Sequence, residues 1–171
     1  MNLYDATVPQ LTKMLVNLEK WLDLGVAFAE KKKFDADRLL EFRLAPDMYS
    51  LIKQVQAIAD GAKFTCAYLA GKQAPSHPDE EKTIAEARAR IRVVIQYLET
   101  FKREDFEGAA DRKIQPRWAA PKWFKGDEYL TQVALPNFYF HVVTAYDILR
   151  NIGVDLGKQD FLGSVPLRDP S

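Results

Sequence analysis

Four segments of this 171-residue chain place apolar side chains at every third or fourth position, the spacing of an amphipathic α-helix. The segments cover approximately residues 8–30, 47–71, 79–102 and 127–152. Gly71 ends the second segment and Gly153 follows the fourth, and a glycine commonly ends a helix. Pro136 lies within the fourth segment and predicts a kink or a local break there. Four amphipathic helices with little strand signal predict an all-α four-helix bundle.

The connection between the third and fourth helices is long and has a composition of its own. Residues 111–126, DRKIQPRWAAPKWFKG, contain two prolines and two tryptophans and show no helical period. We expect a long crossover here, and the sequence leaves open a short β-hairpin within it. Trp118 and Trp123 fit two roles, a cap over the open end of the bundle or part of a dimer surface. The residues after the fourth helix are predicted to be extended and anchored by Phe161 and Leu162.

Length and charge limit the classes of partner. We expect one domain over residues 1–171, a length that suffices for a sizeable core. Lys plus Arg and Asp plus Glu both number 24, so the formal charge of zero gives no reason to expect nucleic acid or an anionic membrane as partner. No apolar run is long enough to span a bilayer, and the N-terminal residues lack the pattern of a signal peptide. The single cysteine, Cys66, cannot form an internal disulfide, which favours a reducing cytoplasm.

The inward faces of the predicted helices exclude one common bundle chemistry. A di-iron or di-manganese bundle needs inward glutamates from several helices. Here the apolar faces carry no Asp or Glu outside the end turns, and Glu19, Asp60, Glu86 and Glu99 lie at their edges or toward solvent. Cys66 lies on an apolar face and is interpreted as a small core residue. No glycine-rich phosphate loop and no G-x-S-x-G motif are present.

His141 is the residue on which a functional interpretation depends. A zinc or nickel site needs about three ligands, and a His-x-x-x-His pattern would place the second one at position 145, which is Ala145. The other histidine, His77, lies in the turn before the third helix, far from His141 in an ordinary bundle. Two other interpretations stay open: a core histidine with hydrogen-bonded nitrogens, and part of a polar pocket for a small molecule.

The polar pocket has further candidates on the same helix. Asn137 and Thr144 lie near His141 on the helical wheel, and Tyr139 and Tyr146 border the opposite edge. Amide, hydroxyl and imidazole groups beside aromatic rings are the typical lining of a small-molecule site between helices.

Several strings of the sequence together resemble one bacterial family. They are RLAPDM (43–48), QVQ (54–56), LAGK (69–72), LPNFYFH (135–141), TAYDILRNIGV (144–154) and LGKQDFLG (156–163). With these strings the chain is similar to the family called domain of unknown function 1993, within the DinB-like (YfiT-like) superfamily. The resemblance covers essentially the whole chain. It implies a four-helix bundle with a long crossover between helices three and four, often assembled as a homodimer.

The resemblance also implies where a metal would lie. In metal-bearing DinB-like proteins, one histidine comes from helix two and two come from a His-x-x-x-His on helix four. His141 matches the first helix-four position, Ala145 stands at the second, and helix two offers Gln54 or apolar residues instead of a histidine. This departure from the pattern argues against a metal.

We therefore expect a metal-free, cofactor-free protein that binds a small ligand or a partner, without nucleic acid or membrane, and forms a homodimer in the cytoplasm. The candidate ligand-binding residues are His141, Asn137, Gln54, Thr144 and Tyr139. The alternative is a degenerate or atypical metal-dependent enzyme, a DinB-like hydrolase or thiol transferase that uses His141. Whether the protein catalyses a reaction stays open.

Overall fold

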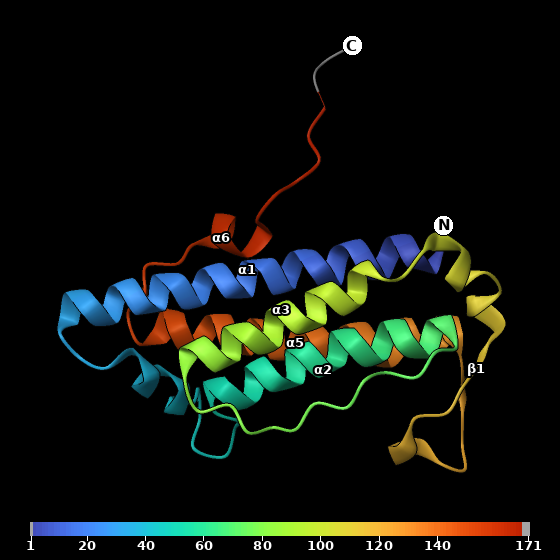
Figure 1. Cartoon of the computed structure of the whole chain (residues 1–171), viewed down its shortest axis with the longest axis horizontal. Helices are drawn as coiled ribbons and strands as arrows, with labels where there is room; N and C mark the ends of the chain where they lie inside the picture. Colours follow the sequence, from blue (N-terminus) through green and yellow to red (C-terminus); the bar gives the residue numbers. More distant parts are fainter. Residues whose placement is uncertain (1, 169–171) are drawn as a thin grey trace.

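The computed structural model describes residues 2–168, and four long helices within this range pack side by side as a bundle (Figure 1). They are α1 (Leu3–Lys32), α2 (Leu51–Ala70), α3 (Ile84–Glu99) and α5 (Leu135–Asn151). Shorter elements connect them or follow them: α4 (Gly126–Tyr129), α6 (Lys158–Leu162), the 3₁₀ helices η1 (Ala36–Glu41), η2 (Arg103–Phe106), η3 (Ala109–Asp111) and η4 (Arg117–Ala119), and the π-helical η5 (Leu130–Ala134). The predicted all-α bundle is confirmed.

Local capping explains where the long helices begin and end. The Asn2 side chain accepts a hydrogen bond from the Tyr4 N–H at 2.9 Å and starts α1. Gly71 ends α2 in a left-handed conformation with φ 67°, as predicted. The expected start of the third helix near residue 79 is wrong. A capping box between Thr83 and Glu86 starts α3 at Ile84, and the preceding residues are extended.

The predicted break at Pro136 is present, as a change of helix type. Helix α4 continues into the π-helical η5, and α5 begins directly before the proline. Proline cannot donate the backbone bond to the residue four positions earlier, and its ring crowds that carbonyl. A wider π-helical turn relieves both problems, and such turns often occur at functional sites.

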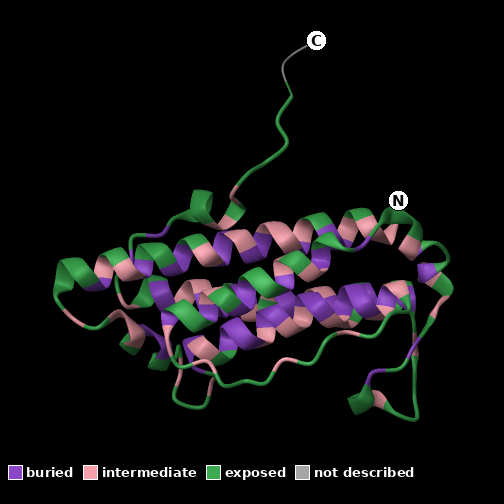
Figure 2. Ribbon diagram, in the orientation of Figure 1, coloured by how far each residue is buried: buried purple, intermediate pink, exposed green. Residues whose placement is uncertain are grey.

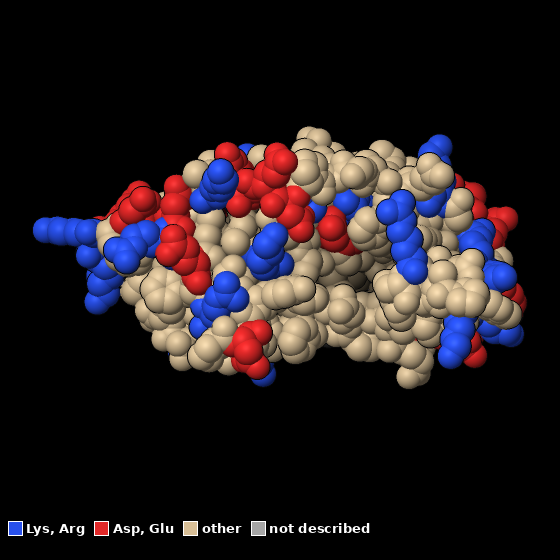
Figure 3. Space-filling model, turned by 90° about the horizontal axis from the view of Figure 1, so that it is seen from below, with Lys and Arg blue, Asp and Glu red and all other residues tan. Residues whose placement is uncertain are grey.

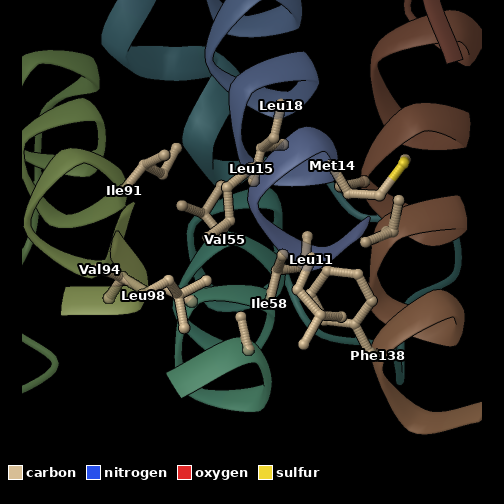
Figure 4. Close-up of a cluster of buried hydrophobic side chains, with 14 of the residues drawn as sticks. Leu11, Met14, Leu15, Leu18, Val55, Ile58, Ile91, Val94, Leu98 and Phe138 are labelled. Carbon is tan, nitrogen blue, oxygen red and sulfur yellow. The ribbon is translucent and has the colours of Figure 1, made fainter. Parts of the chain in front are cut away.

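The core lies along the facing sides of the four long helices (Figure 2). Figure 4 shows its central cluster, to which all four helices contribute. The labelled side chains are Leu11, Met14, Leu15, Leu18, Val55, Ile58, Ile91, Val94, Leu98 and Phe138. Full burial of one such side chain stabilises a protein by about 1.5–3 kcal/mol, so this cluster is the main source of the bundle's stability.

Two irregular segments border α2, one along its length and one at its C-terminal end (Figure 1). Residues 72–83, called the extended segment below, lie between α2 and α3 without regular secondary structure (Figure 1). The predicted crossover follows α3 and carries a small antiparallel hairpin of β1 (Lys113–Ile114) and β2 (Phe124–Lys125). Trp118 is 68% exposed and Trp123 is also exposed, so the interpretation of these rings as a cap over the bundle is wrong.

The segment after α5 differs in part from the prediction. Residues 158–162 form the short helix α6 instead of an extended chain. Phe161 is an anchor as expected, because its ring stacks on Trp21 with centroids 5.7 Å apart. Leu162 is exposed and is not an anchor. The part of this prediction that falls on residues 169–171 lies outside the described residues.

No helix within residues 2–168 combines the length and the apolar composition that crossing a membrane requires.

Candidate functional site

Helices α2 and α5 run antiparallel and share the interface on which the candidate residues meet. Gln54, near the start of α2, meets His141 on α5. Gly61, two turns further along α2, faces the ring of Phe138. Tyr68, near the end of α2, lies edge-on to Tyr129, with ring centroids 5.9 Å apart. The α2–α5 interface therefore leads from the Gln54–His141 contact toward the crossover hairpin.

A hydrogen bond joins the two candidate residues at one end of this interface. His141 Nδ1 lies 2.7 Å from Gln54 Oε1, and Gln54 Nε2 donates to the backbone carbonyl of Tyr49 at 3.3 Å. Gln54 is only 1% exposed, and a buried amide normally needs such partners. We call Gln54 and His141 the neutral pair.

Two aromatic rings flank the imidazole of the neutral pair. The Tyr49 ring is stacked parallel to the imidazole at 6.3 Å, and the Phe140 ring meets it edge-on at 5.3 Å. His141 is half-buried, and this burial lowers the pKa of its imidazole below the usual 6.5. The ring is therefore neutral at pH 7, with one nitrogen as donor and the other as acceptor.

The other three predicted site residues go to different places. Asn137 is exposed and lines the groove described next, one turn before His141. The Thr144 hydroxyl is buried and donates to the carbonyl of Phe140, within its own helix, at 2.7 Å. The Tyr139 hydroxyl accepts a hydrogen bond of 2.6 Å from Gln10 on α1. The structure thus brings Gln54 and His141 into contact, with Asn137 nearby, and directs Tyr139 toward α1.

A groove of about 810 Å³ lies beside the α2–α5 interface. Its floor is formed by α2 and by the α4–η5–α5 region, one wall by the extended segment, and another by the crossover hairpin. Figure 3 views this side of the molecule from below and shows a hollow beside a broad uncharged area, with charged side chains around it. We call this space the interface groove. Its lining residues Ala57 and Asn137 lie one helical turn from Gln54 and His141, respectively.

The interface groove has an aromatic and polar lining. Phe64 and Tyr68 from α2, Tyr129 from α4 and Trp118 from the crossover supply rings. Burial raises the pKa of Tyr129 to about 12, so its hydroxyl is protonated at neutral pH and can donate. Arg117 is exposed in this lining and forms no ion pair with any residue of the described range 2–168.

A second polar cluster on α2 escaped the sequence analysis. Lys63 is 1% exposed, and its Nζ lies 2.8 Å from Asp60 and 3.2 Å from His77 Nδ1. The buried Arg90 of α3 binds Asp60 at 2.8 Å and Glu81 at 3.0 Å. We call Lys63, Asp60, Arg90, Glu81, Asp79 and His77 the buried ion-pair network.

The buried ion-pair network fastens the extended segment to α2 and α3. Arg90 also donates to the carbonyl of Pro78 at 3.0 Å and lies 3.4 Å from the carboxylate of Asp79. Together with Glu81, three residues of the extended segment therefore contact the guanidinium of Arg90. Burial, followed by the charges of Lys63 and Arg90, lowers the pKa of His77. The sequence offered one signal, the Asp60–Lys63 pair at helical spacing, but not the partners that the extended segment brings.

The side chains near His141 do not fit a resident metal. Gln54 offers a single amide oxygen, already engaged by the imidazole, and the buried Ala145 has no donor atom. Within residues 2–168, no three side chains of the types His, Cys, Asp and Glu gather closely enough to hold a metal ion. Cys66 is buried in the core, and burial raises the pKa of its thiol, which disfavours the thiolate that binds metals. A zinc site requires about three such donors.

The fold places the chain in the class of antiparallel four-helix bundles with a long crossover. Comparisons with known proteins identify its family within this class. A crystal structure of a DinB family member protein from Shewanella denitrificans is similar to this chain, with 48% sequence identity and a TM-score of 0.95. The similarity covers 98% of this chain and 96% of the other. Residues 3–162 match the model of the family described as domain of unknown function (DUF1993). A comparison with curated proteins found no match.

The chain belongs to the DUF1993 family and has a DinB-like fold. The resemblance predicted from the sequence strings is confirmed. Neither comparison names a ligand, a reaction or a metal.

Proposed function

We propose that this protein binds a small molecule in the interface groove, without a resident metal. The observation that carries the proposal is the groove of about 810 Å³ that ends one turn from the neutral pair. Sites for drug-sized ligands and cofactors typically have volumes of about 300–1,000 Å³ and combine aromatic walls with a few polar groups. The interface groove has both features.

The proposal gives each group a role. The rings of Phe64, Tyr68 and Trp118 would contact the apolar part of the ligand, because aromatic faces bury large areas and stack well. The amide of Asn137 would bind its polar groups within the groove, and the imidazole of His141, which lies one turn beyond the lining, would bind a polar group at the end of the ligand. Tyr139 and Thr144 would support α5 instead of touching the ligand, since each has a partner elsewhere.

A thermal-shift screen against a metabolite collection tests the proposal. A ligand that binds only the native state must raise the melting temperature. Ala57→Phe would fill the groove from its floor, because Ala57 is half-buried in the lining. Ala85→Phe, at an exposed position of α3 outside the lining, is the matched control. We expect hits whose stabilisation is lost in Ala57→Phe and kept in Ala85→Phe. Hits unaffected by Ala57→Phe would contradict the site.

The metal-free part of the proposal has its own test, which also addresses the alternative of a metal-dependent enzyme using His141. Metal analysis of protein purified without a histidine tag should find no stoichiometric zinc, nickel or iron. The support is the donor set, because one imidazole and one amide oxygen fall short of three ligands. A stoichiometric metal that is lost in His141→Ala would favour the enzyme.

We further propose that the protein forms a homodimer and that the outer face of α5 is its interface. Phe140 is 56% exposed, and Val143, one turn further along α5, is also exposed. Exposed apolar side chains that lie together often mark an interface. Light scattering at micromolar concentration should show a dimer that Phe140→Glu dissociates. A wild-type monomer would contradict the proposed homodimer without affecting the ligand site.

We also propose a reducing cytoplasmic location, supported by the single buried thiol of Cys66.

A further inference from the structure

We propose that His141 offers Nε2 as a hydrogen-bond and proton acceptor to the bound molecule, and that Gln54 is the positioning residue that fixes this role. The inference rests on the proposed small-molecule function and names the chemistry of its ligand. The ligand presents an O–H or N–H group at the neutral pair, and not an anionic oxygen.

The direction of the hydrogen bonds follows from one backbone carbonyl. The Tyr49 carbonyl can only accept, so the atom of Gln54 that lies 3.3 Å from it must be the amide nitrogen. The amide oxygen, Gln54 Oε1, therefore faces His141 at 2.7 Å. An amide oxygen can only accept, so His141 Nδ1 must carry a hydrogen. In a neutral imidazole the other nitrogen, Nε2, then holds a free lone pair.

The free nitrogen has no competing partner in the protein. His141 Nε2 makes no hydrogen bond with any group in residues 2–168, and it is not among the buried polar atoms left without a partner there. It is therefore open to a molecule from solvent. A buried nitrogen without a hydrogen-bond partner would destabilise the fold. An accessible acceptor nitrogen beside a groove can instead accept a hydrogen bond from a ligand.

The surroundings hold the ring in this orientation. Gln54 is buried within the second turn of a 20-residue helix, so its amide has little freedom to turn. The ring of Tyr49 lies parallel to the imidazole and the ring of Phe140 meets it edge-on, so aromatic rings neighbour the imidazole in addition to Gln54. A functional group whose partner fixes its tautomer and its angle is preorganised, which is what binding and proton transfer both require.

The same arrangement permits proton transfer from the ligand to His141 Nε2. When a ligand group D–H donates to Nε2, the nitrogen lone pair takes the proton and D keeps the electron pair of the broken bond. The resulting imidazolium still donates from Nδ1 to Gln54 Oε1, and that hydrogen bond becomes stronger because the donor is charged. Gln54 acts through His141 and need not touch the ligand.

Nitrogen NMR of the ligand-free protein tests the inference independently of any ligand. With ¹⁵N-labelled histidine, long-range ¹H–¹⁵N correlations distinguish the Nδ1–H and Nε2–H tautomers, and a His77→Gln variant assigns the two rings. At mildly alkaline pH, we expect His141 to be in the Nδ1–H form and to shift to a mixture of tautomers in Gln54→Leu. Gln10→Leu, which removes another glutamine–aromatic hydrogen bond, should leave the His141 tautomer unchanged.

Wild-type His141 in the Nε2–H form, or a tautomer that is the same in Gln54→Leu, would overturn the inference. If Gln54→Leu fails to fold, Gln54→Glu replaces it, because a carboxylate in that position also accepts from Nδ1. It should keep the Nδ1–H form and raise the pKa of His141, since a negative neighbour favours the imidazolium. A pKa that does not rise would equally overturn the inference. A failed ligand screen with the expected tautomer would count only against the proposed function.

Discussion

Helix α2 takes part in two polar clusters that differ in charge and in how completely they are satisfied. The buried ion-pair network joins Lys63 and Arg90 to carboxylates of Asp60 and Glu81 and to the extended segment. The neutral pair consists of Gln54 and His141, one uncharged hydrogen bond with an accessible nitrogen at its end. Their members on α2, Gln54 in one cluster and Asp60 and Lys63 in the other, lie less than three turns apart.

The difference separates a structural role from a functional one. Buried cations are tolerated only when partners surround them, and the network uses its charges to hold a loop onto two helices. Apart from the buried Nε of Arg90, which has no hydrogen-bond partner within residues 2–168, its polar atoms are largely engaged with one another. The neutral pair costs less to bury and keeps an acceptor free beside the interface groove.

Among the changes in the two polar clusters, the largest effect is expected from Arg90→Leu. This change leaves the half-buried Glu81 and Asp60 without their guanidinium partner, and breaking a buried ion pair on one side costs about 3–5 kcal/mol. Urea denaturation measures the change in the free energy of unfolding. The matched control is Arg92→Leu, two residues away, whose exposed side chain binds Glu19 and should contribute at most about 1 kcal/mol. Equal losses would remove the distinction between a buried network and a surface ion pair.

A smaller loss is expected from Gln54→Leu. The substitution removes one hydrogen bond to His141 and one to the Tyr49 carbonyl, and a net loss of about 1–2 kcal/mol is typical for such neutral contacts. The same urea experiment measures it. A loss as large as that of Arg90→Leu would mean that the neutral pair is mainly structural.

The pH dependence of stability should be smaller still, and its sign follows from the pKa values. The folded protein holds the pKa values of His141 and His77 below 6.5, so the unfolded chain binds protons first as the pH falls. The free energy of unfolding should therefore be constant above this range and decrease as the pH falls through 6.5 toward the folded-state values. Urea denaturation at pH 7.5 and at about pH 5.5, a range in which histidine titrates, measures the decrease. His141→Gln should lower it, and an unchanged or larger decrease would contradict the account.

Trp118→Ala should change stability least. The ring is 68% exposed, and substitutions at such positions usually stay within about 0.5 kcal/mol. Trp21→Ala is the contrasting control, because that ring is fully buried and packs on Phe161, so its loss should cost about 3–5 kcal/mol. Thermal unfolding of both variants makes the comparison. A large loss in Trp118→Ala would show that this ring supports the fold and is not simply part of the groove wall.

Sequence reasoning predicted the helices well where one local pattern decided the structure. The apolar face of α1 and the glycine cap of α2 follow from spacing and conformational freedom alone. The start of α3 was missed because residues 79–81 are all acidic and look like a helical first turn. Their carboxylates Asp79 and Glu81 instead bind Arg90, a contact that only the tertiary structure brings about.

The candidate site was likewise predictable where a local pattern indicated it, and not where tertiary contacts decide it. His141 and Gln54 came from the wheel and from the family resemblance, and the structure pairs them. Spacing placed Thr144 near His141 and Tyr139 at the opposite edge of the pocket, but it does not reveal that a helix carbonyl binds Thr144 and that Gln10 binds Tyr139. The interface groove was out of reach, because its walls come from two segments without a helical period.

Backbone amide mapping with a fragment library tests most directly where ligands bind. On ¹⁵N-labelled protein, we expect the shifts caused by binding fragments to cluster at the interface groove, with Gly61, Thr65 and Asn137 among the affected amides. Fragments that instead shift the amides of His77, Glu81 and Arg90, around the smaller cavity of about 370 Å³ beside α3, would place the binding site at the buried ion-pair network and contradict the account.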